Sequence, residues 1–160
     1  AMRAKERAAR VGFLFQDAER QIFHSTVAEE VLFSLRDEPL SSGERMERLD
    51  EALCATGLRG KEKKHPLDLN AAERRMVAVA SIAVRGAELL LLDEPSRDFD
   101  PQWQELFEAW LREHNAAVLA ISHDPDFVER LFPQVWELNQ GRLSQRRGRE
   151  APFSIDQRNS

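Results

Sequence analysis

Two adjacent carboxylates, Asp93 and Glu94, follow a run of four leucines and precede Pro95. The run is too short for an independent helix and is typical of a strand buried on both faces, as in a parallel sheet. The two acids would then lie at the carboxyl end of the strand, where open α/β sheets place their ligands. Adjacent buried acids are costly unless they bind a cation, polarise a water or meet a cationic partner. The alternative is a strand end that is acidic by chance.

A glutamine and a histidine end two other apolar runs in the same way. Gln16 follows the run 11–15, and His123 follows the run 116–122. Because the carboxyl ends of parallel strands lie side by side, we expect both side chains to meet the two acids around one pocket. Phosphoryl transfer to water needs a carboxylate that holds Mg²⁺, a group that polarises the attacking water and polar groups around the γ-phosphate. Taken singly, the glutamine is a surface amide and the histidine a strand-end residue, but their joint order favours a functional site.

The rest of the chain predicts the elements that position these groups. Strand–helix–strand alternation from Gly86 to Leu138 indicates a three-layer α/β unit, and residues 24–84 are mostly helical and form a second lobe. Asn70 and Glu73 have the spacing of a capping box at the start of a deeply buried helix. Further helices are predicted from Thr26, up to Gly57, from Pro101 to Leu111 and around Phe127 to Leu131, and a hairpin at Val135–Leu138 and Arg142–Ser144.

Composition restricts the class of protein. The chain has 160 residues, 42% of them hydrophobic, which is enough for one domain with a core, and its formal net charge of −5 gives no general attraction for nucleic acid. The single cysteine, Cys54, lies on an apolar helical pattern and is predicted to be a core residue. One cysteine allows no internal disulfide, which favours a reducing cytoplasmic setting. No apolar stretch reaches the ~20 residues that span a bilayer.

Several motifs together resemble the nucleotide-binding subunit of ABC transporters, from its Q-loop to its C-terminus. The run 11–16 resembles the Q-loop strand, and the run 89–95 resembles the Walker B strand with its catalytic glutamate. Phe99-Asp-Pro101 resembles the D-loop, and Ile121-Ser-His-Asp124 resembles the H-switch. The segment 15–31 is especially similar to the ATPases of energy-coupling-factor importers of vitamins, cobalt and nickel. The resemblance implies an incomplete P-loop NTPase-like three-layer α/β sandwich of the ABC ATPase type with a helical subdomain.

The resemblance also implies a role for each site residue, with ATP and Mg²⁺ as the cofactors of the complete family member. Asp93 would hold Mg²⁺, Gln16 would approach the metal and couple to the membrane subunit, and Glu94 would polarise the lytic water. His123 would contact the γ-phosphate, and Asp100 would act across a dimer interface. The signature segment, whose Asn70, Ala71, Ala72 and Glu73 are the nucleotide-binding candidates, would face the phosphates held by the other subunit.

The implied partners are a transmembrane permease subunit and a second ATPase subunit, with no nucleic acid, at the inner face of the cell membrane. The corresponding division of the chain is a Q-loop strand with its N-terminal flank at 1–23 and a helical subdomain at 24–84. An α/β core follows at 85–145 and a disordered tail at 146–160. An ABC-type repair or translation ATPase is a further possibility, which the segment 15–31 and the acidic balance disfavour.

Two departures from the family pattern bear on activity. The glycine-rich Walker A segment is missing, because the only Gly-Lys pair, Gly60-Lys61, has Ala55 and Glu62 where the motif needs a glycine and a hydroxyl. The signature segment reads Leu69-Asn-Ala-Ala-Glu73, with two Cβ atoms where close approach to phosphate calls for glycine. We therefore expect weak or no ATP binding by this chain.

In the family's sheet, the strand that leads into the Walker A segment lies next to the H-switch strand. Its absence here would leave the 116–122 strand with an unpaired edge. Three interpretations follow. The chain is a C-terminal fragment of such an ATPase, its sheet is completed by a partner or by rearrangement, or it is a non-catalytic module that docks on a membrane subunit or a full ATPase.

Overall fold

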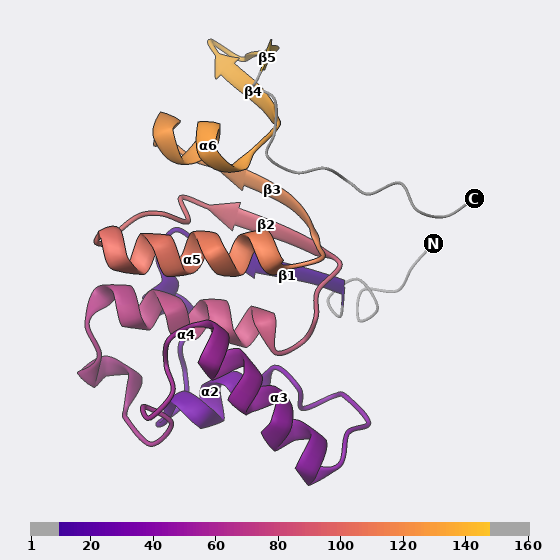
Figure 1. Ribbon diagram of the computed structural model, residues 1–160, viewed down its shortest axis with the longest axis vertical. Helices are drawn as coiled ribbons and strands as arrows, with labels where there is room; N and C mark the ends of the chain where they lie inside the picture. The colour runs from indigo at the N-terminus through magenta and orange to yellow at the C-terminus, as the bar shows by residue number, and fades with distance from the viewer. Residues whose placement is uncertain (1–9, 148–160) are drawn as a thin grey trace. The chain divides into compact units, whose positions relative to one another are not determined.

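The computed structural model describes residues 10–147, and the chain divides into two compact units between Ile121 and Ser122. The described part of the first unit contains three strands with helices between them, and a short helix and a hairpin make up the described part of the second (Figure 1). The expectations for the N-terminal flank before residue 10 and for most of the tail lie outside the described residues.

A three-stranded parallel sheet carries the candidate site. It consists of β1 (Val11–Leu14), β2 (Leu89–Asp93) and β3 (Ala117–Ile121), in the spatial order β1-β2-β3. Leu14 pairs with Leu92, and Asp93 pairs with Ile121, so the three carboxyl ends lie at one edge of the sheet. The predicted parallel α/β sheet, with the three strand ends side by side, is therefore confirmed.

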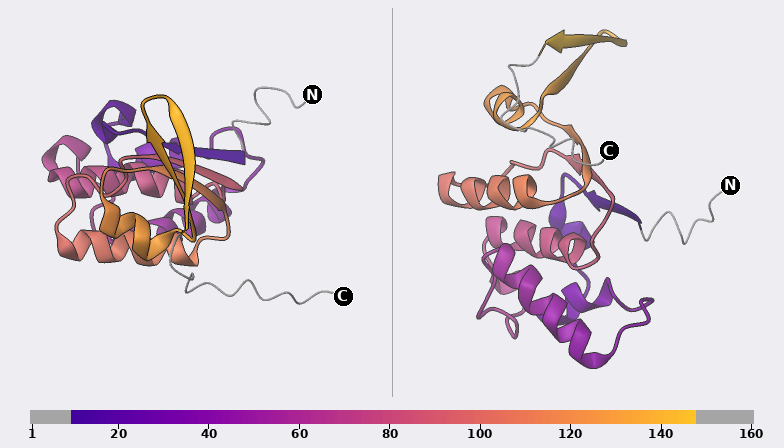
Figure 2. Two further views of the ribbon diagram at one scale, coloured as in Figure 1. Left: turned by 90° about the horizontal axis from the view of Figure 1, so that it is seen from above. Right: turned by 45° about the vertical axis from the view of Figure 1, so that its right-hand side comes forward.

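One face of this sheet packs against helices. The helices α4 (Ala71–Ala83) and α5 (Pro101–Glu113) lie on the same side of the strands in both viewing directions (Figures 1 and 2). Gly12 permits the close approach of α4, because a Cβ atom there would lie 2.3 Å from Cγ2 of Ile82. The side chains that point to this face or line it from α4 are buried, namely Leu14, Leu90, Leu92, Met76, Val77, Val79 and Ala80.

The opposite face of the sheet is largely exposed, so the prediction of strands buried on both faces is wrong. Phe13 is 39% exposed, Leu119 63% and Ile121 64%. Every second residue of β2 is buried while Leu89 and Leu91 are half-buried. The physical reason is that the described helices of the first unit cover only one face. In addition, β3 is an edge strand of the described sheet.

The helical lobe lies beyond α4. It contains a 3₁₀ turn η1 (Ala18–Gln21), α2 (Val27–Phe33), α3 (Ser42–Ala55) and a second 3₁₀ turn η2 (Pro66–Asp68), with contacts from α2 and α3 to α4. Thr26 and Ser41 cap α2 and α3 with their side chains. Cys54 is exposed and not a core residue, because the buried face of α3 is made by Leu49, Ala52 and Leu53 and the next position is turned away from it.

The second unit contains α6 (Pro125–Leu131), followed by the antiparallel pair β4 (Gln134–Asn139) and β5 (Arg142–Arg147). The predicted hairpin is confirmed, and its turn places Gln140 and Gly141 at φ 48° and 75°, the left-handed geometry of a tight hairpin. In the described part of the chain β4 pairs only with β5. The first residues of the predicted tail, Arg146 and Arg147, belong to β5.

Candidate functional site

Asp93 and Glu94 lie where β2 leaves the sheet. Asp93 is the last residue of the strand, and the Glu94 N–H donates to the Ile121 carbonyl oxygen at 2.9 Å, which continues the pairing with β3 by one more bond. Both side chains are partly accessible to solvent. The two carboxylates are thus presented at the carboxyl edge of the sheet, as the sequence predicted.

The backbone of Glu94 is in an unusual conformation. Its φ of 48° places it in the left-handed region, which a residue with a Cβ atom adopts only at a cost of roughly 1–3 kcal/mol. Asp98, in the same connection to α5, has a φ of 67°. Such conformations persist where the surrounding structure enforces them, and they cluster at functional sites.

Gln16 lies beside this edge. Leu14 pairs with Leu92, and Gln16 and Glu94 each lie two positions after these paired residues. The side chain of Gln16 is exposed. The turn that carries it is held by Gln21, whose side-chain amide donates to the Phe13 carbonyl at 3.0 Å and accepts from the Phe15 N–H at 3.0 Å. The structure therefore brings Gln16, Asp93 and Glu94 to one edge, as expected from the parallel sheet.

Arg75 of α4 joins the two loops that carry these residues. Nη2 donates to the Gln16 carbonyl at 2.6 Å, and Nη1 donates to the Glu94 carbonyl at 3.2 Å. Burial of the guanidinium lowers the pKa of Arg75, and the nearby Asp98 carboxylate opposes that shift. The sequence analysis missed this residue, although an arginine inside a helix predicted to be buried on almost every face was an available signal.

Alternating charges extend from Arg75 across the mouth of the site. Asp98 pairs with Arg75 at 3.6 Å and with Arg97 at 3.8 Å, and Arg97 reaches Asp17 at 3.8 Å. Asp17 in turn pairs with Arg20 at 3.2 Å. These side chains, with Gln16, Ala18 and Ala71, line a hollow of about 350 Å³. The hollow brings the loop after β1, the start of α4 and the loop after β2 together.

The signature segment forms the start of α4. The predicted capping box is confirmed, since Asn70 Oδ1 accepts from the Glu73 N–H at 2.8 Å and Glu73 Oε2 accepts from the Asn70 N–H at 3.0 Å. Glu73 also pairs with Lys61 at 2.5 Å, and this bond lowers the pKa of its carboxyl group. Ala71 is exposed, whereas Ala72 is buried. Of the two alanines, only Ala71 presents its Cβ atom to solvent at the place where the family pattern has glycine.

The two remaining predicted residues, Asp100 and His123, have different local settings. Asp100 caps α5, because Oδ1 accepts from the Trp103 N–H at 3.0 Å, and the residue is exposed. His123 follows β3 by two positions, belongs to the second unit and is exposed. The residues that the structure gathers within the first unit are therefore the amide, the two acids and the start of α4.

Comparison with known proteins agrees with this arrangement. A family model described as ABC transporter matches residues 2–97, more than half of the chain. The chain belongs to the ABC transporter family. It resembles an energy-coupling factor transporter ATP-binding protein, EcfA, of Methanothermobacter thermautotrophicus at 33% identity over 84% of this chain and 44% of that protein. A second relative, EcfA2 of Lacticaseibacillus paracasei, is 31% identical over 84% of this chain and 48% of its own length.

A solved structure supports the same assignment. CbiO1 from Clostridium perfringens, part of the ABC transporter complex CbiONQ, superposes with a TM-score of 0.76 at 28% identity, over 85% of this chain and 56% of that one. The chain thus spans about half the length of the curated ABC relatives it matches. Among the described residues no helix is both long and apolar enough to cross a membrane.

The described residues of this ABC chain do not make a metal site by themselves. In the described part of the chain no group of three or more His, Cys, Asp or Glu side chains is placed to hold an ion. Mg²⁺ is commonly held by one or two protein carboxylates together with substrate phosphates and waters. Asp93 fits the role of one such carboxylate, but the phosphates that would complete the site need a backbone cradle that the 160 residues lack.

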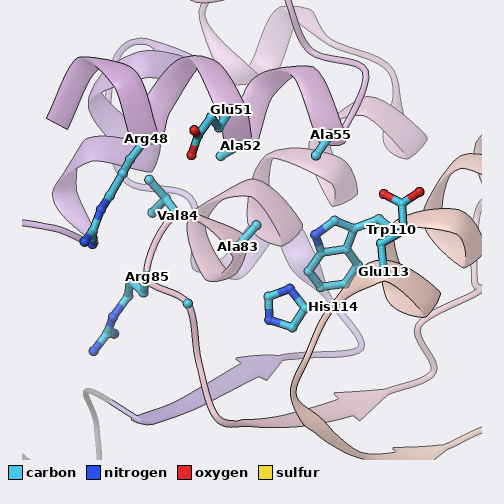
Figure 3. A pocket seen from close by; sticks show the side chains of 11 residues that line it. Arg48, Glu51, Ala52, Ala55, Ala83, Val84, Arg85, Trp110, Glu113 and His114 are labelled. Atoms are coloured by element: carbon cyan, nitrogen blue, oxygen red, sulfur yellow. The ribbon is translucent and has the colours of Figure 1, made fainter. Parts of the chain in front are cut away.

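A second hollow of the first unit lies away from this site. It has a volume of about 550 Å³ and is lined by one face of α3 and the ends of α4 and α5 (Figure 3). Trp110 and His114 line one side of it and Arg48 and Arg85 the other (Figure 3). Burial lowers the pKa of His114, and a hydrogen bond with the Ala87 backbone opposes the shift. None of the predicted site residues lies in this hollow.

Proposed function

We propose that this chain is part of the ATP-binding subunit of an ABC-type importer, which in the complete protein couples ATP hydrolysis to the uptake of a metal ion or vitamin. The observation that carries the proposal is the juxtaposition of Gln16 with Asp93 and Glu94 at the carboxyl edge of the sheet, with Glu94 in the left-handed region. The similarity to EcfA and CbiO1 supports the importer class.

The proposed roles are those that the family resemblance implies for these residues. Asp93 contributes a carboxylate to the Mg²⁺ of a bound nucleotide, and Glu94 polarises the attacking water. Gln16 lies beside them and links the site to the membrane subunit, while His123 contacts the γ-phosphate. Asp100 and the signature segment from Asn70 to Glu73 act across the interface with a second ATPase subunit.

The 160 residues alone are proposed to be inactive. They contain no glycine-rich loop with a lysine to neutralise a triphosphate, and Ala71 places a Cβ atom at the exposed start of α4. Isothermal titration of the chain with Mg-ATP is the direct test. We expect no heat of binding at micromolar concentration, and a saturable micromolar isotherm that Asp93→Asn abolishes would contradict the proposal.

The sheet is proposed to be completed by polypeptide outside these 160 residues. Parallel sheets are almost always covered on both faces, yet Phe13, Leu119 and Ile121 are exposed here. Relatives of about twice the length provide a source for the missing cover. We expect co-expression with the N-terminal half of an EcfA relative to give a soluble complex that hydrolyses ATP, and Glu94→Gln in this chain to abolish that activity.

The same proposal assigns a transmembrane permease subunit and a second ATPase subunit as partners, at the inner face of the cell membrane. A tagged chain that retains a permease from detergent extracts, and loses it in a variant with Gln16 and its neighbours replaced, would support this assignment. A monodisperse chain that retains neither partner would count against it.

A second function is favoured by the signature segment. With Ala71 and Ala72 in place of glycines and no phosphate loop, the chain has the composition of a non-catalytic module that docks on a membrane subunit or a full ATPase. ATP hydrolysis by the complex distinguishes the two functions. A non-catalytic module adds no ATP hydrolysis to that of its partner, and Glu94→Gln changes neither that rate nor the binding of the partner.

A further inference from the structure

Among the lysines and arginines whose burial the structure describes, Arg75 is the one with a buried side chain. It is 2% exposed, although its neighbour Arg74 on the same helix is half-buried. Burying a guanidinium is costly unless its hydrogen bonds are satisfied. The partners that Arg75 has acquired therefore indicate what it does.

Two of those partners are backbone carbonyls of residues proposed to act in hydrolysis. The guanidinium reaches the Gln16 carbonyl with Nη2 at 2.6 Å and the Glu94 carbonyl with Nη1 at 3.2 Å. The planar fork of an arginine fixes the two acceptors relative to each other, which a lysine ammonium cannot do with one point charge. One side chain of α4 thus sets the spacing between the loop after β1 and the loop after β2.

The third partner fixes the far end of the second loop. Asp98 Oδ2 lies 3.6 Å from Nη2 of Arg75, and Asp98 is the other residue of this loop with a positive φ. The Glu94 carbonyl also accepts from the Arg97 N–H at 3.2 Å, so Arg75 binds the same carbonyl oxygen that closes a turn over residues 94–97. The backbone of Glu94 is therefore bonded both to α4, through Arg75, and to β3.

We propose that Arg75 is a positioning residue, which transmits the orientation of α4 to the backbone of Gln16 and Glu94. The signature segment begins the same helix one turn earlier. When a nucleotide or partner subunit binds at Asn70 or Ala71 and moves α4, Arg75 moves with the helix and displaces both loops. The importance of this link for hydrolysis rests on the proposed function. The mechanical coupling itself does not, and it is measurable in the chain without nucleotide.

A purely structural role for Arg75 would give a different result. An arginine that only fills the core lowers the stability of the whole unit when it is replaced, and all protected amides then exchange faster together. A positioning residue releases the two loops selectively. The reporters are the amides of Arg20, Glu94 and Arg97, each of which donates to a backbone carbonyl within these loops or to β3, and the reference is the middle of α4.

Hydrogen exchange of the 160-residue chain tests the proposal with Arg75→Met, Arg75→Lys and the control Arg74→Met. Arg74 is the neighbouring arginine on the same helix, and it donates to the carbonyl of Leu69, which lies in neither loop. We expect Arg75→Met and Arg75→Lys to raise the exchange rate of the reporter amides about tenfold relative to that of the amides in the middle of α4. Arg74→Met should leave this ratio of exchange rates unchanged.

Three outcomes would overturn the proposal. They are unchanged reporters in Arg75→Met, acceleration that is uniform across the core, and full protection in Arg75→Lys, which would mean that charge alone suffices. If Arg75→Met leaves no protected core, the ratio in Arg75→Lys decides. A failure of ATP binding by this chain would not alter any of these exchange ratios, so the two proposals fail separately.

Discussion

Glu94 donates its backbone N–H to the carbonyl oxygen of Ile121 at 2.9 Å, so the proposed catalytic carboxylate takes part of its position from the edge strand of the described sheet. Arg75 supplies the second restraint, through the Glu94 carbonyl at 3.2 Å. Between these two bonds the backbone of Glu94 is held at a φ of 48°. The conformation of Glu94 therefore costs free energy of folding, and mutagenesis can measure that cost.

Glu94→Gly is expected to stabilise the chain. Glycine adopts a positive φ without steric cost, so the free energy of unfolding should rise by up to about 1 kcal/mol despite the greater entropy of the unfolded chain. Denaturant unfolding of the two proteins measures the difference. The matched control is Asp93→Gly, at an extended strand position, where glycine should lower the free energy of unfolding by about 0.5–1 kcal/mol. Equal losses in both variants would contradict the interpretation of Glu94 as a strained residue.

Features with a local cause were predicted well from the sequence. The capping box of Asn70 and Glu73 depends on two side chains three positions apart, and the burial of α4 follows from its apolar composition. The gathering of Gln16 with the two acids required only that the strands be parallel and adjacent, a property of the fold class.

Features that depend on distant or missing partners were not predictable in this way. Leu119 belongs to an apolar strand that was predicted to be buried, yet its side chain is exposed. The reason is that burial depends on what packs against a strand and not on the sequence of the strand itself. The burial of Arg75 could have been inferred from its apolar helix, but its partners could not, because they lie 59 and 19 positions away. Cys54 was misplaced because one position on a helix turns a side chain by about 100°.

The exposed face and free edge of β3 predict self-association of the isolated chain. Leu119 and Ile121 are 63% and 64% exposed on a strand whose outer edge is unpaired within residues 10–147, and such an edge is a template for pairing with another chain. The double replacement Leu119→Lys with Ile121→Lys should lower the aggregated fraction severalfold in light scattering. Leu67→Lys is the control, because Leu67 is 67% exposed on a 3₁₀ turn. An equal improvement from Leu67→Lys would show that general hydrophobicity, and not the edge, is responsible.

Gly12→Ala is expected to destabilise the first unit. The new Cβ atom would lie 2.3 Å from Cγ2 of Ile82 and 3.0 Å from Cδ2 of Leu90, which forces α4 from β1 at a cost of about 1–3 kcal/mol. Unfolding in denaturant measures this, and the cost should largely vanish in an Ile82→Ala background, where the nearest methyl group is removed.

The same substitution elsewhere provides the control for Gly12. Gly43 lies in α3 with only the Ser41 Oγ as near as 4.0 Å, so Gly43→Ala should stabilise the chain by roughly 0.5–1 kcal/mol through helix propensity. If the cost of Gly12→Ala is the same with and without Ile82, close packing of α4 on β1 is not the reason for the glycine.

The stability of the chain should fall between neutral and mildly acidic pH because of His114. This residue ends α5 with its ring 5.1 Å from that of Trp110, and burial lowers its pKa below the ordinary value near 6.5. The folded state therefore binds the proton less readily than the unfolded state. The contribution of His114 is complete above the unfolded pKa and is lost as the pH falls from there through the folded pKa. Free energies of unfolding at pH 7.5 and 5.5 should differ less in His114→Gln than in the parent chain, and an identical pH dependence in the two proteins would contradict this assignment.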